Sequence, residues 1–559
     1  MAALTLEQAF PLALGHHQAG RLAEAEAMYR QILAAQPNHA EALHLLGVLA
    51  AGAGRFEEAI GWISRAITLL PGRPVFHVNL GVAFRRMGRL EDAAANLQRA
   101  VALAPQMAEA HMNLGDAEIG LGRMDEAIAS NRRALALRPD YAEASNNLGN
   151  ALGGKQRWDE AMACYHRALA LRPDYAEAHN NVGNALIEHG RWSEAIPHCR
   201  RALELKPDLI EAYENVGIAL VETQEFGAAL DFFRQAIAVR PDFAPVHWNL
   251  ALLLMRIGRW EEGWREYEWR WRHDGFASQR RNFPVPQWDD SRAKDATVLI
   301  HTEQGFGDTL QFLRYVPLVA ARVGRVILEC PEKLVRLVVQ SGGWNADIVV
   351  RGTGALPLFD RHIPMLSLPL ALGHFEPLPM EAPYLRADSG MRAAWRERIG
   401  SSSDRRVGLA WAGSPEHRQD ARRSIAEEKL LPLLHMPDVR FFSLQAGPRG
   451  ALPQVLADAG VTDLRPHLTD FADTAALMAE LDLIITVDTS VAHLAGALGR
   501  PVWMLLPYVP DWRWGLEKED TPWYPSMRLF RQPRMGDWDS VIRRVAEELR
   551  ALQTSAMGK

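Results

Sequence analysis

The first half of the chain repeats one pattern of small, apolar and polar residues every 34 residues. Proline keeps this spacing without a break, at Pro37, Pro71, Pro105, Pro139, Pro173, Pro207 and Pro241. In register with it stand the small residues Gly47, Gly81, Gly115, Gly149, Gly183 and Gly217, and Ala25, Ala59, Ala93, Ala127, Ala161, Ala195 and Ala229. Small residues let two helices approach closely, and proline starts the connection to the next pair. The pattern therefore predicts stacked helical hairpins.

Phrases such as AEAHNNVGNALIEHGRWSEAIPHCRRALELKPD resemble the tetratricopeptide repeat family. We expect eight repeats over residues 6–273, starting near 6, 40, 74, 108, 142, 176, 210 and 244. The resemblance implies an all-α superhelix whose first helices line a concave groove, a surface that usually binds peptides. We interpret the aromatic segment WEEGWREYEWRW, at the end of the eighth repeat, as a cap that docks onto the next domain.

One position of the repeats carries asparagine in six successive repeats. This column consists of Asn79, Asn113, Asn147, Asn181, Asn215 and Asn249. Because an amide side chain offers two donors and an acceptor, such a column could bind the backbone of an extended polypeptide. The alternatives are that the amides tie one hairpin to the next, or that recent duplication copied them. The repeat half is also similar to that of protein O-linked N-acetylglucosamine transferases, in which such a ladder grips acceptor polypeptides.

After Arg272 the period stops, and the pattern changes to short apolar runs that alternate with helical segments. Residues 274–294 are predicted to form a linker, and a new fold begins near residue 295. The run TVLIH is followed by a turn over Gly305–Asp308, then by the helical segment TLQFLRYVPLVAARVG and the run RVILEC. This order of strand, glycine turn, helix and strand predicts a first α/β domain over 295–385.

A second set of alternating elements covers residues 386–559. After a helix near 391–399 come the runs RRVGLAWAGS, VRFFSLQAG and LDLIITVDTSVAHLAGALGRPVWMLL. Short buried strands between helices indicate two parallel α/β layers that face each other. Ligands of such sheets lie at the carboxyl ends of the strands. Both the Gly305–Asp308 turn and the Asp488–His493 turn are expected there.

The segments QGFGDTLQFLRYVP and VDTSVAHLAGALGRPVWML resemble the bacterial heptosyltransferase family of glycosyltransferases. The resemblance covers roughly 295–550 and implies a GT-B-like fold with two facing Rossmann-like domains. It also implies that Asp308 is the general base that activates the acceptor hydroxyl. Two departures are evident: the first domain is shorter than in that family, and the acidic or lysine residues usual near the donor's ribose and phosphates are not evident.

The turn after the apolar run 481–487 is the predicted donor site. A helix N-terminus can stabilise the diphosphate of a nucleotide sugar through its amides, aided by hydroxyl and cationic groups. Asp488 could cap this helix, and Thr489 and Ser490 could present hydroxyls and amides, with His493 on the first turn. The alternative is that these residues only cap and pack. For Asp308 too, the alternative is a helix cap.

Further donor-binding candidates follow other predicted strands and turns. They are Gly305 and Gly307, then Trp411, Gly413 and Ser414, then Arg418, Arg422 and Arg423 in a basic loop, and Gln445 after VRFFSL. A solvated basic loop is the alternative for the arginines. The aromatic residues Trp512, Trp514, Trp523 and Tyr524 are expected to pack a long loop rather than to stack on a base or sugar.

Composition narrows the possible partners and cofactors. With 62 basic and 68 acidic residues the net charge is −6, which argues against nucleic acid as a partner. The three cysteines fit neither a disulfide framework nor a zinc site, and we expect no metal cofactor. No apolar stretch is long enough to span a membrane, and the N-terminus lacks a signal-peptide pattern, so we expect a cytoplasmic protein.

The sequence therefore predicts a glycosyltransferase that uses a nucleotide-sugar donor, with repeats that recruit a polypeptide acceptor or a partner of a glycan-assembly system. The alternative is a non-catalytic, protein-binding adaptor whose α/β part is degenerate or purely structural. The short first domain favours the adaptor. The retention of both turns, Gly305–Asp308 and Asp488–His493, favours catalysis.

Overall fold

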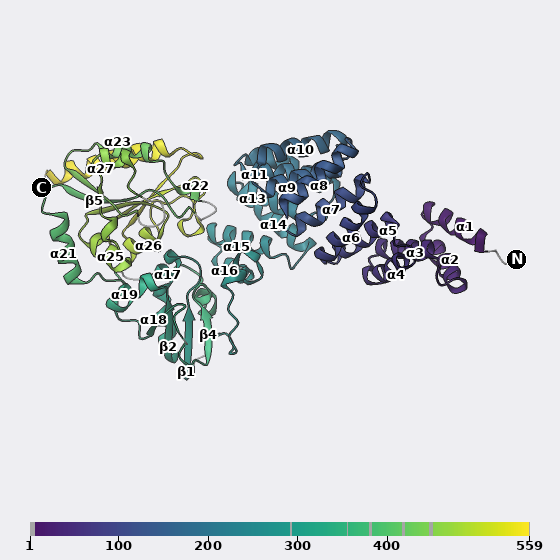
Figure 1. Cartoon of the computed structure of the whole chain (residues 1–559). Helices are drawn as coiled ribbons and strands as arrows, with labels where there is room; N and C mark the ends of the chain where they lie inside the picture. The colour runs from purple at the N-terminus through teal and green to yellow at the C-terminus, as the bar shows by residue number, and fades with distance from the viewer. Residues whose placement is uncertain are drawn as a thin grey trace. The chain divides into compact units, whose positions relative to one another are not determined.

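A computed structural model describes residues 6–290, 293–354, 356–379, 383–415, 420–445 and 451–557 (Figure 1). The chain divides into two compact units, Met1–Thr223 and Gln224–Lys559. The first unit consists of helical hairpins, and the second combines three further repeat helices with two parallel β-sheets.

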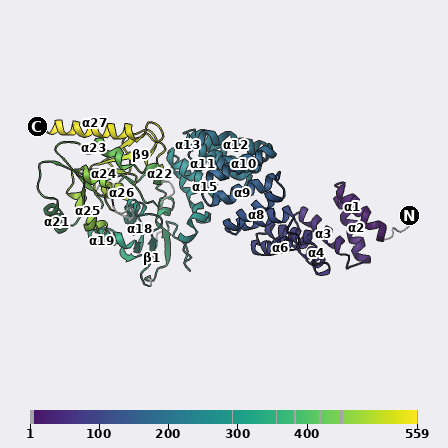
Figure 2. The ribbon, with the colours of Figure 1, turned by 45° about the horizontal axis from the view of Figure 1, so that its top comes forward.

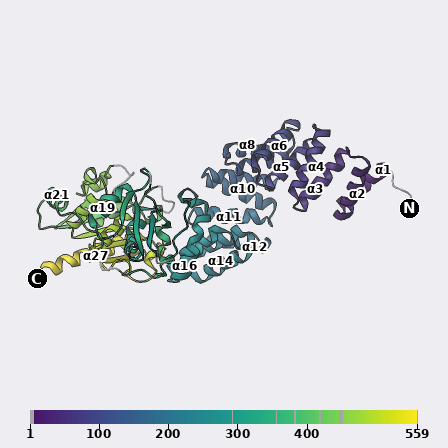
Figure 3. The ribbon, with the colours of Figure 1, turned by 90° about the horizontal axis from the view of Figure 1, so that it is seen from below.

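The helices of the first unit pack as consecutive antiparallel pairs (Figure 3). They are α1 (Leu6–Gln18), α2 (Leu22–Ala35), α3 (Ala40–Gly52), α4 (Phe56–Leu69), α5 (Pro74–Arg86), α6 (Leu90–Leu103), α7 (Ala108–Gly120), α8 (Met124–Leu137), α9 (Ala142–Gly154), α10 (Trp158–Leu171), α11 (Ala176–Glu188), α12 (Trp192–Leu205) and α13 (Ile210–Glu222). The first helices of the repeats begin at the residues where the 34-residue period puts the repeat starts.

The repeating glycine is a point of close helix contact. A Cβ atom at Gly149 would lie 2.4 Å from Cε1 of Tyr165 in the partner helix, and one at Gly183 would lie 2.1 Å from Sγ of Cys199. The turn of each hairpin needs a left-handed residue, which is Gly122 (φ 73°) in one repeat and Gln156 (φ 59°) in the next. Hairpin packing and turn conformation thus both explain the repeated small residues.

The second unit begins with the last repeat helices. These are α14 (Phe226–Val239), α15 (Ala244–Arg256) and α16 (Trp260–Tyr267), followed by the 3₁₀ turns η1 (Glu268–Arg272) and η2 (Asp274–Gln279). Ala251, Met255, Trp264 and Tyr267 from these helices lie in the same buried cluster as side chains of both sheet domains. The aromatic end of the repeats is thus part of the core of this unit.

Residues 274–290, which the sequence predicts as a linker, pack onto the first sheet. Trp288 is buried, and its backbone N–H donates to the carbonyl oxygen of His362 at 2.8 Å. Gln287 forms a parallel bridge with the same residue. The segment therefore covers the edge of the sheet rather than spanning open solvent.

The first sheet contains four parallel strands in the order β3-β2-β1-β4. The strands are β1 (Ala293–His301), β2 (Val323–Cys330), β3 (Asp347–Val350) and β4 (Arg361–Pro364), and the helical elements are α17 (Phe306–Phe312), η3 (Leu313–Tyr315), α18 (Val316–Ala320), α19 (Glu332–Ser341), η4 (Met365–Ser367) and α20 (Leu368–Ala371). The predicted single helix after the glycine turn is wrong in one respect. It is broken into α17, η3 and α18, because Pro317 has no N–H to continue the helix.

The second sheet contains six parallel strands in the order β10-β9-β8-β5-β6-β7. The strands are β5 (Arg405–Ala410), β6 (Val439–Ser443), β7 (Thr462–Asp463), β8 (Leu483–Val487), β9 (Val502–Leu506) and β10 (Met527–Arg531). The helical elements are α21 (Ser389–Ile399), α22 (Asp420–Arg423), η5 (Glu427–Leu430), α23 (Leu431–Leu434), α24 (Gln454–Asp458), η6 (Arg465–His467), α25 (Phe471–Ala479), α26 (Ser490–Ala497), η7 (Trp512–Trp514) and α27 (Trp538–Met557).

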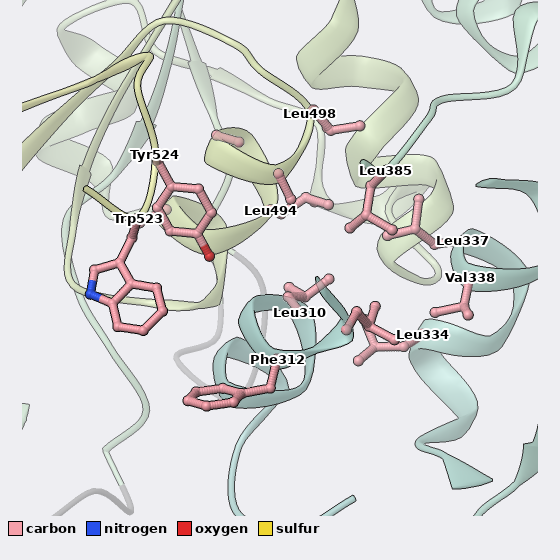
Figure 4. Packing of buried hydrophobic residues seen from close by; sticks show 14 of the residues in the cluster. Leu310, Phe312, Leu334, Leu337, Val338, Leu385, Leu494, Leu498, Trp523 and Tyr524 are labelled. Carbon is pink, nitrogen blue, oxygen red and sulfur yellow. The ribbon is translucent and has the colours of Figure 1, made fainter. Parts of the chain in front are cut away.

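Alternate residues of the second sheet enter two different buried clusters. Leu483, Ile485 and Val487 of β8 pack with Val541 and Val545 of α27, the long C-terminal helix drawn in yellow in Figure 2. On the other face, β8 contributes Ile484 to the cluster that it shares with the first sheet domain. Figure 4 shows side chains of that cluster from both domains, including Leu310 of α17, Leu337 of α19 and Leu494 of α26. The two sheet domains thus share one core.

Candidate active site

The predicted site lies where the order of the strands in each sheet reverses. In the second sheet, β5 and β8 are neighbours, and the chain continues from them to opposite edges. In the first sheet the chain goes from β1 through β2 to β3 at one edge and then returns to β4 on the other side of β1. Ligands of parallel sheets bind in the crevice beyond the carboxyl ends of such strands. The Gly305–Asp308 turn follows β1, the segment Trp411–Ser414 follows β5, and the Asp488–His493 turn follows β8.

The two turns that sequence analysis assigned to the site are in direct contact. Helix α17, which starts in the first turn, packs against α26, which starts in the second. The contact is so close that a Cβ atom at Gly307 would lie 2.8 Å from Cδ2 of His493. Gly307 and His493 therefore form the meeting point of the two sheet domains.

His493 is a buried, neutral side chain. It is 5% exposed, its Nδ1 lies 3.0 Å from the hydroxyl of Tyr524, and its ring lies 5.4 Å from the ring of Trp514. Burial holds the pKa of His493 well below its usual value, and the nearby guanidinium of Arg513 adds to this effect. At neutral pH the imidazole can therefore accept or donate a hydrogen bond but carries no charge.

Asp308 caps helix α17 and forms an ion pair. Its Oδ2 accepts a hydrogen bond from the backbone N–H of Gly305 at 2.9 Å, which is the capping role considered as the alternative. Its Oδ1 accepts from Nη2 of Arg513, which belongs to the second sheet domain. Both carboxylate oxygens are thus engaged in the structure, while the side chain stays 17% exposed.

Arg513 is a site residue that sequence analysis missed. It is 9% exposed and donates to three side chains: Asp308, Gln311 at 2.6 Å and Asp511 at 2.8 Å. The Nε2 of Gln311 is buried and has no hydrogen-bond partner among the described residues. The only signal in the sequence is an arginine between two tryptophans in PDWRWG, a pattern that indicates packing because two of the arginine's partners, Gln311 and Asp308, lie about 200 positions away.

Asp488 lies beside this cluster at the end of β8 and is half-buried. Burial and, to a smaller extent, the charge of Asp511 raise the pKa of its carboxyl to about 6, while Arg423 and Arg513 oppose the rise. The prediction that Asp488 caps α26 is wrong. The N-cap is Thr489, which has the extended backbone (φ −146°, ψ 174°), and no side chain caps this helix end.

Thr489 and Ser490 are half-buried at the start of α26. The Oγ1 of Thr489 lies 3.4 Å from Oγ1 of Thr486, and Ser490 is the first residue of the helix. Their backbone amides are the first N–H groups of α26, which is where a helix favours negative charge.

The side chain of Gln445 binds the backbone of the segment after β5. Oε1 of Gln445 accepts from the backbone N–H groups of Trp411 (3.2 Å) and Ala412 (3.1 Å), and its Nε2 donates to the carbonyl of Ala412 (2.9 Å). Both ends of this buried amide thus hold the segment directly after β5, and the donor contact of Gln445 stays a prediction.

Gly413 marks a second point of close approach. A Cβ atom there would lie 2.2 Å from Oδ1 of Asp420 and 2.6 Å from Nε of Arg423. Arg423 is paired with Asp420 at 3.3 Å, and its charge acts on Asp488 and His493. Ser414 and Arg422 are exposed nearby, whereas the predicted Arg418 lies outside the described residues.

The aromatic residues of the 510–524 segment pack as expected. Trp512, Trp514, Trp523 and Tyr524 are all nearly fully buried. Arg314, also fully buried, donates to the carbonyls of Gln311 and Trp523 at 2.9 and 3.1 Å and lies over the ring of Tyr524. This arginine, also missed from the sequence, joins the two sheet domains behind the site.

The asparagine column forms hydrogen bonds along the stack of repeats. In the first unit, Nδ2 of Asn79 lies 2.8 Å from His44, that of Asn181 lies 2.9 Å from Asn146 and from Asn150, and that of Asn215 lies 3.0 Å from Asn180. Asn147 contacts Met112 in the same manner, whereas Asn113 bonds to Glu109 of its own helix. Asn249 belongs to α15 of the second unit. These contacts match the alternative in which the amides tie one hairpin to the next.

Comparison with known proteins gives matches in both halves of the chain. Residues 10–74, 78–142, 146–210 and 217–267 match the tetratricopeptide repeat family, and residues 454–533 match glycosyltransferase family 9 (heptosyltransferase). The chain is thus similar to the tetratricopeptide repeat family over most of its first half and to glycosyltransferase family 9 over one segment of its second half. That segment includes the Asp488–His493 turn and Arg513 but not Asp308.

Among curated proteins, Protein FlbA of Caulobacter vibrioides is 27% identical over 348 residues. The match covers 55% of this chain, and the chain spans about half the length of that relative. Two solved structures illustrate the similarity. One is MamA, with 27% identity, 30% of this chain and 96% of that chain covered, and a TM-score of 0.27. Another is a tetratricopeptide repeat protein from Parabacteroides merdae, which is 15% identical. That match covers 44% of this chain and 98% of that chain, with a TM-score of 0.39.

The described part of the chain contains neither a membrane-spanning helix nor a metal-binding cluster. No described helix combines the length and the apolar character needed to cross a membrane. Within the same residues, no group of three or more His, Cys, Asp and Glu side chains is arranged to hold a metal ion.

Proposed function

We propose that this chain is a glycosyltransferase that binds a nucleotide-sugar donor between its two sheet domains and uses its repeats to recruit a polypeptide acceptor or partner. The observation that carries the proposal is the direct contact of the two turns, Gly307 against His493. Both turns follow parallel strands at their carboxyl ends, where ligands of such sheets bind. The family 9 match over 454–533 supports the same assignment.

In the proposed reaction the donor's diphosphate lies at the start of α26. The backbone amides of Thr489 and Ser490 and the guanidinium of Arg513 would offset the negative charge that develops on the leaving diphosphate. Asp308 would accept the proton of the acceptor hydroxyl as its oxygen bonds to the anomeric carbon and the bond from that carbon to the diphosphate breaks. Transfer of Arg513 from Asp308 to the diphosphate would leave Oδ1 of Asp308 available for this proton.

A non-catalytic adaptor is the second candidate, and a specific observation favours it. Both oxygens of Asp308 are already engaged, one by a helix cap and one by Arg513. In an adaptor this ion pair would only join the two domains. The asparagine column, with its amides bonded along the stack, gives the repeats a rigid surface for a protein partner in either case.

Thermal unfolding of the full chain with a panel of nucleotide sugars tests the proposal. A donor present at 100 times its dissociation constant should stabilise the fold by roughly 2.7 kcal/mol. Asp488→Asn and His493→Gln should abolish the shift, and Asn184→Ala, an exposed change in the repeats, should keep it. If no donor or free nucleotide shifts the transition, the adaptor is the better account.

A second measurement separates binding from catalysis. Asp308→Asn keeps an oxygen for the Gly305 cap but removes the base, so donor binding should persist while donor turnover, followed as hydrolysis or transfer, falls by about 10²–10⁴-fold. Unchanged turnover in this variant would exclude Asp308 as the base.

A further inference from the structure

The loop from Pro507 to Trp514, which carries Arg513, has few hydrogen bonds of its own. It connects β9 to η7 without regular structure, and Pro507 and Pro510 have no N–H to donate. Its carbonyl groups therefore depend on donors from elsewhere in the fold. Where these donors come from decides how Arg513 is positioned.

Two of the donors come from the repeat helices. Nε2 of Gln224, in the turn before α14, donates to the carbonyl of Tyr508 at 2.9 Å. Nε of Arg256, at the end of α15, donates to the carbonyl of Pro510 at 3.0 Å. A guanidinium donor makes this second bond a charge-assisted one. Both acceptors lie within a few residues of Asp511 and Arg513.

Aromatic rings of α16 hold the same loop from the side. The ring of Trp260 meets that of Trp512 edge-on at 5.9 Å, and the ring of Trp264 does so at 5.4 Å. Trp264 also donates from Nε1 to the carbonyl of Phe375 at 2.8 Å, which fixes its orientation against the first sheet domain.

The same helical hairpin also holds the other turn of the site. The hydroxyl of Tyr267 accepts from Nε2 of Gln304 at 2.7 Å, and Gln304 has a left-handed backbone (φ 58°) directly before Gly305. Arg270 binds both carboxylate oxygens of Glu303 at 3.0 and 2.9 Å, and both side chains are nearly fully buried. One hairpin thus contacts the segments that carry Asp308 and Arg513.

We infer that the last repeat hairpin (α15 and α16) and the turn before α14 are part of the donor site's scaffold, and that Arg256 and Gln224 are positioning residues that set the place of Arg513. The inference rests on the proposed function. Arg513 reaches Asp308 across the junction of the two sheet domains, so a small displacement of its loop breaks that bond. Geometry at this scale controls ligand binding, because charge-assisted hydrogen bonds tolerate only short distances.

Hydrogen–deuterium exchange on full-length variants tests this inference without any substrate. The variants are Arg256→Ala, the conservative Arg256→Lys, the milder Gln224→Ala, and the control Arg265→Ala, which removes an exposed arginine of α16 that pairs with Glu261. Arg256→Ala should speed exchange of the 508–515 amides by about tenfold. Gln224→Ala should do so to a smaller extent, Arg256→Lys should restore slow exchange at least in part, and Arg265→Ala should match the wild type.

Affinity for UDP, GDP, ADP and dTDP is the second readout. Arg256→Ala should weaken the binding of whichever diphosphate the wild type binds by about tenfold, with recovery in Arg256→Lys. A merely structural role would instead speed exchange throughout residues 224–557 and leave the 508–515 segment no different from the rest. Wild-type exchange and affinity in both Arg256→Ala and Gln224→Ala overturn the inference. A wild type that binds none of the diphosphates overturns the proposed function, while the exchange data still decide the positioning role.

Discussion

Replacement of Gly307 by alanine tests the contact on which the proposed site depends. The new Cβ atom would lie 2.8 Å from Cδ2 of His493, whereas carbon atoms in proteins pack at about 3.5–4.0 Å. The His493 ring cannot move away freely, since Tyr524 holds its Nδ1 at 3.0 Å and Trp514 lies against its face. Overpacking of this kind costs about 1–3 kcal/mol, and loss of the buried hydrogen bond adds about 0.5–1.5 kcal/mol.

We therefore expect Gly307→Ala to lower the free energy of unfolding by about 2–3 kcal/mol. Urea unfolding followed by tryptophan fluorescence reports this change, because most of the 17 tryptophans lie after residue 224. Gly305→Ala is the matched control from the same turn. Its Cβ atom would meet only Oδ2 of Asp308, at 3.2 Å, with an ordinary φ of −91°, so its effect should stay within about 0.5 kcal/mol. Equal effects of the two variants would refute the close contact between α17 and α26.

Three further predictions address other parts of the structure. Asp488→Asn should stabilise the fold by about 1–3 kcal/mol at pH 8 and by about half as much at pH 5. With a folded pKa near 6, the favourable contribution of the Asp488 carboxyl is complete below about pH 4 and is lost as the pH rises through 6. Equal gains at both pH values in urea unfolding would contradict this. Gly149→Ala should destabilise the repeats by about 1–3 kcal/mol because its Cβ atom would lie 2.4 Å from Tyr165. Gly61→Ala, in an exposed part of α4 with open space around it, should instead stabilise them by about 0.5–1 kcal/mol. Thermal unfolding in which Gly149→Ala stabilises and Gly61→Ala destabilises would refute the repeat packing. Asn181→Ala should cost about 1–2 kcal/mol because it leaves the buried Asn146 Oδ1 without its donor, and a loss no larger than that of the exposed Asn184→Ala would show that the amide does not tie the hairpins together.

The repeat half was predictable because its determinants are local in the sequence. The contact of Gly149 with Tyr165 spans only 16 positions, and the same spacing recurs in each repeat, so the period itself encodes the packing. A second regularity links histidine to the repeated proline. His77, His111, His179 and His247 each place Nε2 within 3.2 Å of the carbonyl of the proline six residues earlier, so the recurrent proline is also an acceptor.

The candidate site was predictable only where its residues follow strands. The Asp488–His493 turn and the Gly305–Asp308 turn were found because a strand and a helix flank each of them. Arg513 and Arg314 were not, because each acts through partners on another domain. The structural contacts of Gln445 could not be predicted for a related reason: the backbone amides that it binds, those of Trp411 and Ala412, lie 34 and 33 positions away.

The boundary between the repeats and the sheet domains could not be read from the period. Repeat spacing continues through α15, yet the second compact unit begins at Gln224. The cause is the aromatic end of the repeats. Trp264 and Tyr267 are buried against the sheet domains, so the last helices share a core with them even though their sequence follows the repeat pattern.

The most direct test of the account is a hydrogen-exchange footprint of the full chain with the nucleotide sugar that gives the largest thermal shift. If the two turns form one donor site, the donor should slow exchange in three separate segments, 305–312, 488–494 and 508–515. Protection of 488–494 alone would contradict the claim that Asp308 and Arg513 belong to that site.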